Sequence, residues 1–354
     1  MALANSISIF VKNLQSGGAE KQSVLLAKAL ANNYNVHYII FNGDKVHQKY
    51  IDMLKKEPHI QIKSFRGNHY HRYKNFVAYL KQEKITIIFS YLTAANTYAC
   101  LAGKQTGIKV FTGIRNTQLP FLKYLADCLL TNWFAEKAIS NSYAAKEIFI
   151  NKGFKRDKVI VIPNCFENIT PYRAKPDRSS LHIITVGRFV PQKDYLTAIR
   201  AISELKKIKA NIWFDIIGYG ELEGQIRNWI KEYGIADITT IYINPDNIPE
   251  LLEQADIYIS TSLFEGTSNS IMEAMNANLP IVATDVGDNK YLIQHGTNGY
   301  LCKQKDCTNI AQYLKILLYN KELRIKQGRE SKEILLNKYS IDILIQKYDK
   351  LLNE

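Results

Sequence analysis

The stretch ISIFVKNLQSGGAEKQSVLLAKAL, residues 7–30, indicates the fold of the chain. It opens with an apolar run from Ile7 to Val11, which predicts a buried strand. The loop LQSGGAEKQ follows, and then apolar residues from Val24 to Leu30 recur with the spacing of an amphipathic helix. A strand, a glycine-rich turn and a helix in this order are typical of a parallel sheet covered by helices.

The same alternation continues through the chain and starts again after a proline-containing segment, ENITPYRAKPDRSS, at residues 167–180. A chain of 354 residues also exceeds the size at which one hydrophobic core usually stops growing. We therefore predict an α/β fold of two Rossmann-like, doubly wound parallel-sheet domains that face each other across a cleft. The predicted parts are an N-terminal Rossmann-like domain (1–165), a linker (166–180), a C-terminal Rossmann-like domain (181–338) and a C-terminal helix that can cross back to the first domain (339–354).

Charge is distributed unevenly between these domains. Residues 1–165 hold 23 Lys and Arg against 9 Asp and Glu, whereas residues 166–354 hold 23 against 24. The first domain should therefore meet an anionic partner. The chain shows no apolar stretch long enough to span a bilayer and starts without the basic region of a secretory signal, so we expect a cytoplasmic protein. The five scattered cysteines are expected to be free thiols.

One basic and aromatic segment, Ile62 to Lys84, could be the anionic contact. It can lie on an anionic membrane surface and would then make the protein peripheral on the inner face of the plasma membrane. A simple solvated helix explains the segment equally well. A nucleic-acid partner is not expected, because no nucleic-acid-binding motif accompanies it.

Two acidic residues eight positions apart frame the strongest motif, EGTSNSIME, at residues 265–273. The preceding strand should end near Ser260, which places Glu265 in a loop and Glu273 in the next helix, so that both carboxylates can face one site. The small polar residues between them can offer backbone N–H groups at a helix N-terminus to an anion. Two isolated glutamates would more often be a turn acid and a solvated helix residue.

A second motif, GRFVPQK, follows an earlier strand at residues 187–193. Arg188 and Lys193 lie five positions apart at what should be the C-terminal edge of the sheet, where ligands of open α/β sheets bind. A guanidinium fork and a compact ammonium suit the charges of a diphosphate. Taken alone, these two residues would be read as solvated surface cations.

With both motifs in this order, the chain resembles the family 4 retaining glycosyltransferases of the GT-B fold. The resemblance extends over nearly the whole sequence. Its matching segments are SGGAE (16–20), VIPN (161–164), VGRFVPQKD (186–194), GYGE (218–221), EGTSNSIMEAM (265–275), LPIVATDVG (279–287) and NGYL (298–301).

The resemblance implies roles for individual residues. Arg188 and Lys193 would bind the donor diphosphate and stabilise the leaving nucleoside diphosphate in place of a metal ion. Glu273 would hold the ribose hydroxyls, and Glu265 would contact the hydroxyls of the donor sugar. Other donor-binding residues would use backbone groups that approach the ligand closely. These are Gly17, Gly18, Gly187, Gly266, Thr267, Ser268 and Asn269.

The chain departs from many relatives at one place. They carry a first-domain histidine near the donor sugar, whereas this sequence reads TGIRNT at residues 112–117. Arg115 and Asn116 resemble a subset of relatives with Arg-Asn there and could contact the sugar or an acceptor phosphate. A solvated loop is the equally open alternative.

The resemblance implies a metal-independent transferase that moves a hexose or N-acetylhexosamine from a nucleotide sugar, with UDP as the carrier, to a glycan or lipid-linked acceptor in surface polysaccharide synthesis. The configuration would be retained by front-face attack without a protein nucleophile, and no cofactor is implied. Two alternatives stay open. One is a sugar-nucleotide epimerase or phosphorylase of the same fold, and the other is a two-lobed binding protein without catalysis, which should lack the site residues that are present here.

Overall fold

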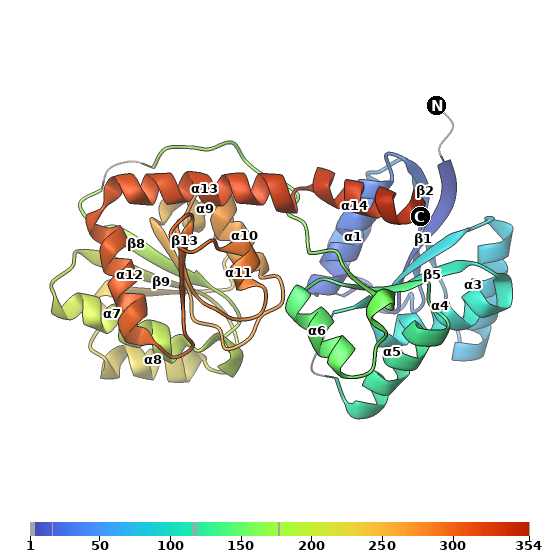
Figure 1. Cartoon of the computed structure of the whole chain (residues 1–354), viewed down its shortest axis with the longest axis horizontal. Coiled ribbons are helices and arrows are strands. Elements are labelled where there is room, and N and C mark those ends of the chain that lie inside the picture. The colour runs from blue at the N-terminus through green and yellow to red at the C-terminus, as the bar shows by residue number, and fades with distance from the viewer. Residues whose placement is uncertain (1–3, 16, 116–118, 176–177, 354) are drawn as a thin grey trace. The chain divides into compact units, whose positions relative to one another are not determined.

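The computed structural model describes residues 4–15, 17–115, 119–175 and 178–353. The chain divides into two compact units: unit 1 is Met1–Glu167 with Ile341–Glu354, and unit 2 is Asn168–Ser340. Each unit is built on one parallel sheet covered by helices (Figure 1). The predicted class of two parallel-sheet α/β domains is therefore confirmed.

Unit 1 contains a seven-stranded sheet in the order β3-β2-β1-β4-β5-β6-β7. The first strand is central, and Ile9 pairs with Tyr38 on one side and with Phe89 on the other. These three side chains are buried because helices cover both faces of a parallel sheet. The strands are β1 (Ala4–Val11), β2 (Tyr34–Ile40), β3 (Ile60–Ser64), β4 (Ile87–Tyr91), β5 (Lys109–Ile114), β6 (Lys137–Ser140) and β7 (Val159–Val161).

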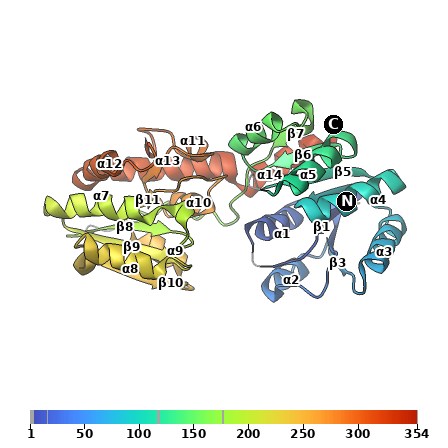
Figure 2. The same cartoon turned by 90° about the horizontal axis from the view of Figure 1, so that it is seen from below.

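The helices of unit 1 form two layers. Helix α1 packs against α2 and α14 over one core, and the helices from α3 to α6 cover the opposite face. Figure 2 shows α1 and α2 apart from α3 and α4 in this unit. The helices are α1 (Gly18–Leu30), α2 (Gln48–Lys55), α3 (His69–Gln82), α4 (Thr93–Thr106), α5 (Phe121–Trp133), α6 (Tyr143–Asn151) and α14 (Ile341–Asn353).

The last helix, α14, supplies part of the unit 1 core. Tyr348 is buried and its ring meets that of Phe89 edge-on, with centroids 5.2 Å apart. On the same helix, Asp349 accepts a hydrogen bond of 3.1 Å from the hydroxyl of Tyr34. The end of the chain is thus an integral element of the first unit.

Unit 2 contains a six-stranded sheet in the order β10-β9-β8-β11-β12-β13. All four residues of β11 and of β12 are buried, as expected for short, apolar central strands. The strands are β8 (Leu181–Val186), β9 (Ile212–Gly218), β10 (Thr239–Ile243), β11 (Ile257–Ser260), β12 (Ile281–Thr284) and β13 (Gly299–Cys302).

Helices also cover both faces of this second sheet (Figure 1). Helix α7 packs against α8 and α12 on one face, while α10 packs against α9 and α13 on the other. Among the described residues of the whole chain, no helix combines the length and the apolar character needed to cross a bilayer. The helices are α7 (Tyr195–Lys207), α8 (Glu223–Glu232), α9 (Ile248–Gln254), α10 (Asn269–Asn276), α11 (Asn289–Leu292), α12 (Cys307–Tyr319) and α13 (Lys321–Tyr339).

The structure adds two strands of unit 1 to those that the sequence indicated. Strand β3 occupies the start of the basic segment at residues 62–84, and β6 has only four residues. In β3 only Ile60 is buried, as expected at a sheet edge, where the apolar pattern is weak. The rest of the basic segment forms α3, whose apolar Phe76, Val77 and Leu80 face inward.

Candidate active site

The two motifs of unit 2 meet at the point where the strand order of its sheet reverses. Strands β8 and β11 are parallel neighbours, with β9 and β10 on one side and β12 and β13 on the other. The loop after β8 begins at Gly187, and the loop after β11 begins at Thr261. Both leave the same carboxyl edge at a topological switch point, which is where open α/β sheets bind ligands.

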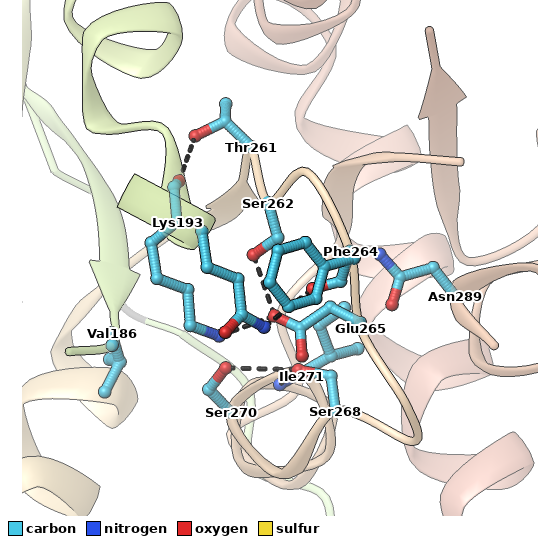
Figure 3. A network of polar contacts seen from close by, with 12 residues as sticks. Val186, Lys193, Thr261, Ser262, Phe264, Glu265, Ser268, Ser270, Ile271 and Asn289 are labelled. Atoms are coloured by element: carbon cyan, nitrogen blue, oxygen red, sulfur yellow. Dashed lines mark hydrogen bonds and ion pairs between the residues drawn. The ribbon is translucent and has the colours of Figure 1, made fainter. Parts of the chain in front are cut away.

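A cation from one motif loop contacts a carboxylate from the other (Figure 3). The ammonium of Lys193 donates a hydrogen bond of 2.5 Å to Oε1 of Glu265. The hydroxyl of Ser262 donates to the same oxygen at 2.8 Å. The Lys193 and Glu265 side chains are only 17% and 9% exposed, so the pair is partly shielded from water and its electrostatic interactions are stronger than on an open surface.

Backbone contacts hold the Lys193 loop against the Glu265 loop. Lys193 ends a short 3-10 turn, and Asp194 follows in the left-handed region with φ +44°. The hydroxyl of Thr261 donates to the carbonyls of Lys193 and Asp194 at 3.1 and 2.9 Å. The N–H of Leu263 donates to the carbonyl of Gln192 at 2.8 Å. The position of the Lys193 side chain therefore depends on both loops.

Two glycines allow these loops to pack tightly on their neighbours. A Cβ on Gly218 would lie 1.9 Å from the carbonyl oxygen of Gly187, and a Cβ on Gly287 would lie 1.9 Å from that of Glu265. Gly287 also has φ +54°, a conformation that other residues rarely adopt. The glycines of the GYGE and ATDVG segments thus fix the backbone of each motif loop.

Glu273 lies on α10, the helix that begins directly after the Glu265 loop. Ser268 caps this helix, and its hydroxyl accepts a long hydrogen bond of 3.5 Å from the N–H of Ile271. Beneath the loop, burial raises the pKa of the Tyr258 hydroxyl, and the negative charges of Glu273 and Glu265 raise it further. Both carboxylates therefore raise the pKa of the same buried phenol, which belongs to β11.

Two residues of the predicted donor-binding loop after Glu265 are buried in unit 2. Thr267 and Ser268 are buried, and the hydroxyl of Thr267 donates to the carboxylate of Asp288 at 3.4 Å. Gly266 and Asn269 are half-buried on either side of these residues. This arrangement leaves the start of α10 close to the Lys193–Glu265 pair, as Figure 3 shows for Ser268 and Ser270.

Arg188 differs from Lys193 in its surroundings. Its side chain is exposed, and it forms no ion pair or side-chain hydrogen bond within the described part of the chain. Gly187, the residue before it, would place a Cβ 3.2 Å from the Lys193 side chain, so the loop brings both cations to the same edge. Arg188 is thus able to reorient towards a ligand without breaking an existing ion pair.

Among the predicted residues of unit 1, Gly17 and Gly18 lie at its own switch point, between β1 and β4. A pocket of about 110 Å³ lies there, and its lining includes Lys12, Glu20 and Tyr91. Gly17 caps the N-terminus of α1 and Gly18 is its first residue, immediately before the lining residue Ala19. The glycine-rich turn predicted from the sequence therefore borders this pocket.

Arg115 lies next to the unit 1 pocket, because it contacts Tyr91, which lines that pocket. Its guanidinium lies over the Tyr91 ring, 4.7 Å from the centroid, and donates a hydrogen bond of 2.8 Å to the side chain of Asn164. Its Nε is buried and finds no acceptor among the described residues. The solvated-loop alternative does not fit these contacts for Arg115, whereas Asn116 lies outside the described residues.

Sequence reasoning missed several residues that shape the donor-side site. Ser262 bonds Glu265, Thr261 bonds the Lys193 backbone, and Asp288 bonds Thr267. Ser262 and Thr261 directly follow β11, and polar residues at the carboxyl end of a buried strand were the signal that could have indicated them. Among the described residues, no group of three or more His, Cys, Asp or Glu side chains is arranged to hold a metal ion.

Comparisons with known proteins agree with this arrangement. The protein-family model described as Glycosyltransferase Family 4 matches residues 16–167, and the one described as Glycosyl transferases group 1 matches residues 171–334. An uncharacterized glycosyltransferase of Haemophilus influenzae is 27% identical over 98% of this chain and 99% of its own. The Campylobacter jejuni GalNAc-alpha-(1->4)-GalNAc-alpha-(1->3)-diNAcBac-PP-undecaprenol alpha-1,4-N-acetyl-D-galactosaminyltransferase is 24% identical over 92% of each chain.

Solved structures share the fold over the whole chain. Anabaena Alr3699/HepE in complex with UDP has a TM-score of 0.86 at 18% identity, covering 98% of this chain and 99% of its own. TarM has a TM-score of 0.81 at 15% identity, covering 100% and 99%. The two family models match consecutive parts of the chain, and the fold is that of GT-B glycosyltransferases. The chain therefore belongs to the glycosyltransferase family that these two models describe, family 4.

Proposed function

We propose that this glycosyltransferase moves a hexose or N-acetylhexosamine from a UDP sugar to a lipid-linked or glycan acceptor in surface polysaccharide synthesis. The observation that carries the donor half is the contact between Lys193 and Glu265 at the switch point of unit 2. The acceptor half is supported by relatives, since the Campylobacter jejuni relative is named for an undecaprenol-linked acceptor and an Escherichia coli relative for a diphosphoundecaprenol one.

The chemistry assigned to unit 2 follows from its charges. An ammonium has three N–H donors, so Lys193 can keep its bond to Glu265 while it donates to a phosphate oxygen. Arg188 adds a planar fork for a second phosphate oxygen. Glu265 would accept hydrogen bonds from the sugar hydroxyls, and Glu273, further along α10, from the ribose hydroxyls.

In the proposed reaction, the bond between the sugar C1 and the β-phosphate oxygen breaks as the acceptor oxygen bonds C1 on the same face. The acceptor proton passes to the departing phosphate, and the products are the glycoside and UDP. Arg188 and Lys193 stabilise the charge that develops on the leaving group, which is the role that a preorganised cation performs best. No metal ion is needed in this scheme, and the configuration at C1 is retained.

The alternatives differ in the second substrate that each reaction needs and in whether UDP is released. A transferase releases UDP when the acceptor is present, an epimerase of this fold acts without an acceptor, and a phosphorylase needs inorganic phosphate. A binding protein without catalysis would release none. Since both cations and both carboxylates are present, the transferase reaction fits this chain better than the binding alternative.

The test combines a donor screen with two variants. A thermal-shift screen of nucleotide sugars identifies the donor, because a ligand at about 100 times its Kd adds roughly 2.7 kcal/mol of stability. With that donor, Arg188→Ala and Lys193→Ala should each lower turnover by about 10²- to 10³-fold.

Lys231→Ala provides the control, since this exposed lysine lies on α8 and makes no side-chain ion pair among the described residues. A folded double variant of Arg188 and Lys193 with wild-type turnover would remove the diphosphate assignment. A retained anomeric configuration in the product, read by nuclear magnetic resonance, tests the stereochemical part separately.

A further inference from the structure

Helix α5 of unit 1 buries one face and exposes apolar side chains on the opposite face. Its inner face consists of Tyr124, Asp127, Cys128 and Thr131, which are all buried. Tyr124 and Cys128 belong to the core that α5 shares with α6. These positions recur with helical spacing, so the packing of α5 onto the rest of unit 1 is already accounted for by this face.

The opposite face is apolar and exposed to solvent. Leu122 is 77% exposed, Leu125 43%, Leu129 48% and Trp133 70%, and these residues follow one another along a single stripe. Phe121 at the start of the helix is 77% exposed, and Phe134 just after it is 44% exposed. We call these six residues the α5 outer face.

Such a face is unusual for a helix on the surface of a soluble domain. An amphipathic surface helix normally turns charged and polar residues outward, and contiguous exposed apolar patches mark interaction sites. The core of unit 1 does not require these side chains, since the inner face already supplies Tyr124 and Cys128. The α5 outer face is therefore available to a partner outside the unit.

Lysines surround the α5 outer face and indicate the charge of that partner. Lys155 lies 4.6 Å from the centroid of the Trp133 ring, and Lys104 lies 5.0 Å from that of Phe134. Lys123 is exposed on the helix itself. The single acidic residue of α5, Asp127, is turned inward and accepts hydrogen bonds from Thr93 and Asn96 at 2.6 and 3.0 Å.

Exposed aromatic and leucine side chains with lysines around them are complementary to the surface of an anionic bilayer. Apolar side chains enter the boundary between headgroups and acyl chains, and the lysine stems lie along the apolar surface while their ammonium groups reach anionic headgroups. A second copy of this chain fits less well, because a twofold contact through this face would set the same lysine fringe against itself.

We propose that the α5 outer face docks unit 1 onto an anionic lipid surface. The proposal does not depend on the donor chemistry of unit 2. It places the contact away from the basic segment at residues 62–84, where the sequence alone pointed. There Arg66 and Arg72 already pair with Asp44, at 3.8 and 3.2 Å, and Tyr70 is the exposed large apolar side chain of α3.

The first test measures binding of the full chain to vesicles. Vesicles of phosphatidylglycerol and phosphatidylethanolamine should sediment the wild type, whereas phosphatidylcholine vesicles should sediment much less. The variant Leu122→Gln/Leu125→Gln/Leu129→Gln keeps good helix formers at exposed positions and should lower the partition constant at least tenfold, because burying one such side chain contributes about that factor.

A matched control removes three exposed apolar side chains of unit 2, one at the C-cap of α7 and two on α12 and α13, in the variant Ile208→Gln/Ile316→Gln/Leu336→Gln. It should bind as the wild type does. Thermal unfolding checks that both triple variants are folded. If the α5 triple variant partitions like the wild type, or if the wild type prefers neutral vesicles, the proposal is wrong. A wild-type dimer that the α5 variant dissociates, without any vesicle binding, would identify the face as a self-contact instead.

The second test locates the contact. The chain has three tryptophans, so Trp213→Phe/Trp229→Phe leaves Trp133 as the sole reporter. Its fluorescence should shift to the blue with anionic vesicles and be quenched by brominated acyl chains. Adding Lys63→Ser, Arg66→Ser, Arg72→Ser and Lys74→Ser should leave that shift in place. An unchanged Trp133 spectrum on vesicles that sediment the protein would assign the contact to another surface.

Discussion

Replacing Gly287 by alanine should disable the enzyme without touching any ligand-binding side chain. Gly287 has φ +54°, and a Cβ there would lie 1.9 Å from the carbonyl oxygen of Glu265. The residue on the other side of this contact carries the carboxylate that binds Lys193 at 2.5 Å. The substitution therefore pushes directly on the backbone of the Glu265 loop.

The magnitude follows from two costs. A left-handed conformation costs a residue with a Cβ about 1–2 kcal/mol. Contacts of Cβ atoms below 3.0 Å essentially do not occur, so the Glu265 loop must move by about 1 Å, and such overpacking costs about 1–3 kcal/mol. We expect the free energy of unfolding of unit 2 to fall by about 2–5 kcal/mol, which lowers Tm by roughly 5–15 °C. Because a displacement of 1 Å in a site can cost 10²-fold in rate, turnover should fall by about that factor.

The assay compares thermal unfolding and initial rates of Gly287→Ala with those of Gly224→Ala. Gly224 lies in the first turn of α8, and a Cβ there meets nothing within 4 Å. Alanine at that helical position should stabilise the protein by about 0.5–1 kcal/mol and leave turnover unchanged. If Gly287→Ala kept both the Tm and the turnover of the wild type, the tight contact beneath Glu265 would not position the site.

Three further outcomes are expected. Glu273→Ala should weaken UDP binding by about 1.5–3 kcal/mol, because a hydrogen bond to a charged group is lost. Glu265→Ala should lower turnover more than it weakens the binding of bare UDP. Calorimetry measures the binding, and initial rates measure the turnover. Turnover should survive chelation by EDTA, and a strict dependence on manganese would contradict the proposed reaction. Burial lowers the pKa of Lys175 to about 8, so the unfolded chain binds more protons above that pH and stability should rise from pH 8 towards about 9.5. Denaturant titrations should show this rise, and Lys175→Met should reduce it.

The sequence was sufficient to predict strands such as β1 and β8 but not β3 and β6. Strands β1 and β8 are rich in apolar residues, precede glycine-containing turns, and have a neighbouring strand on each side. Strand β3 buries only Ile60 at a sheet edge, and β6 has four residues, so neither produces a clear period. Strands with several apolar residues leave a strong signal, while strands as weakly patterned as β3 or as short as β6 owe their position to neighbours that are remote in sequence.

The site was predictable to the level of its charged residues. Lys193 and Glu265 were identified from their motifs, and the structure brings them into contact. Their support was not visible in the sequence, since Ser262 and Gly287 acquire their roles only when three loops meet at one edge of the sheet. Arg115 was predicted as a contact for the sugar or an acceptor phosphate, but its stacking on Tyr91 could not be predicted because Tyr91 lies on a strand 24 residues away.

The packing of α14 into unit 1 has a consequence for the order of events during synthesis. Unit 2 is made of one continuous stretch, Asn168–Ser340, and all of its residues have been polymerised before Tyr348 exists. The earlier part of unit 1 lacks Tyr348 against Phe89 until α14 has been made. Domains generally fold as units in the order in which they are made. Here the core of unit 1 can close only after the whole of unit 2 has been made, and a chain cut before Ile341 would keep unit 2 complete and leave the core of unit 1 open.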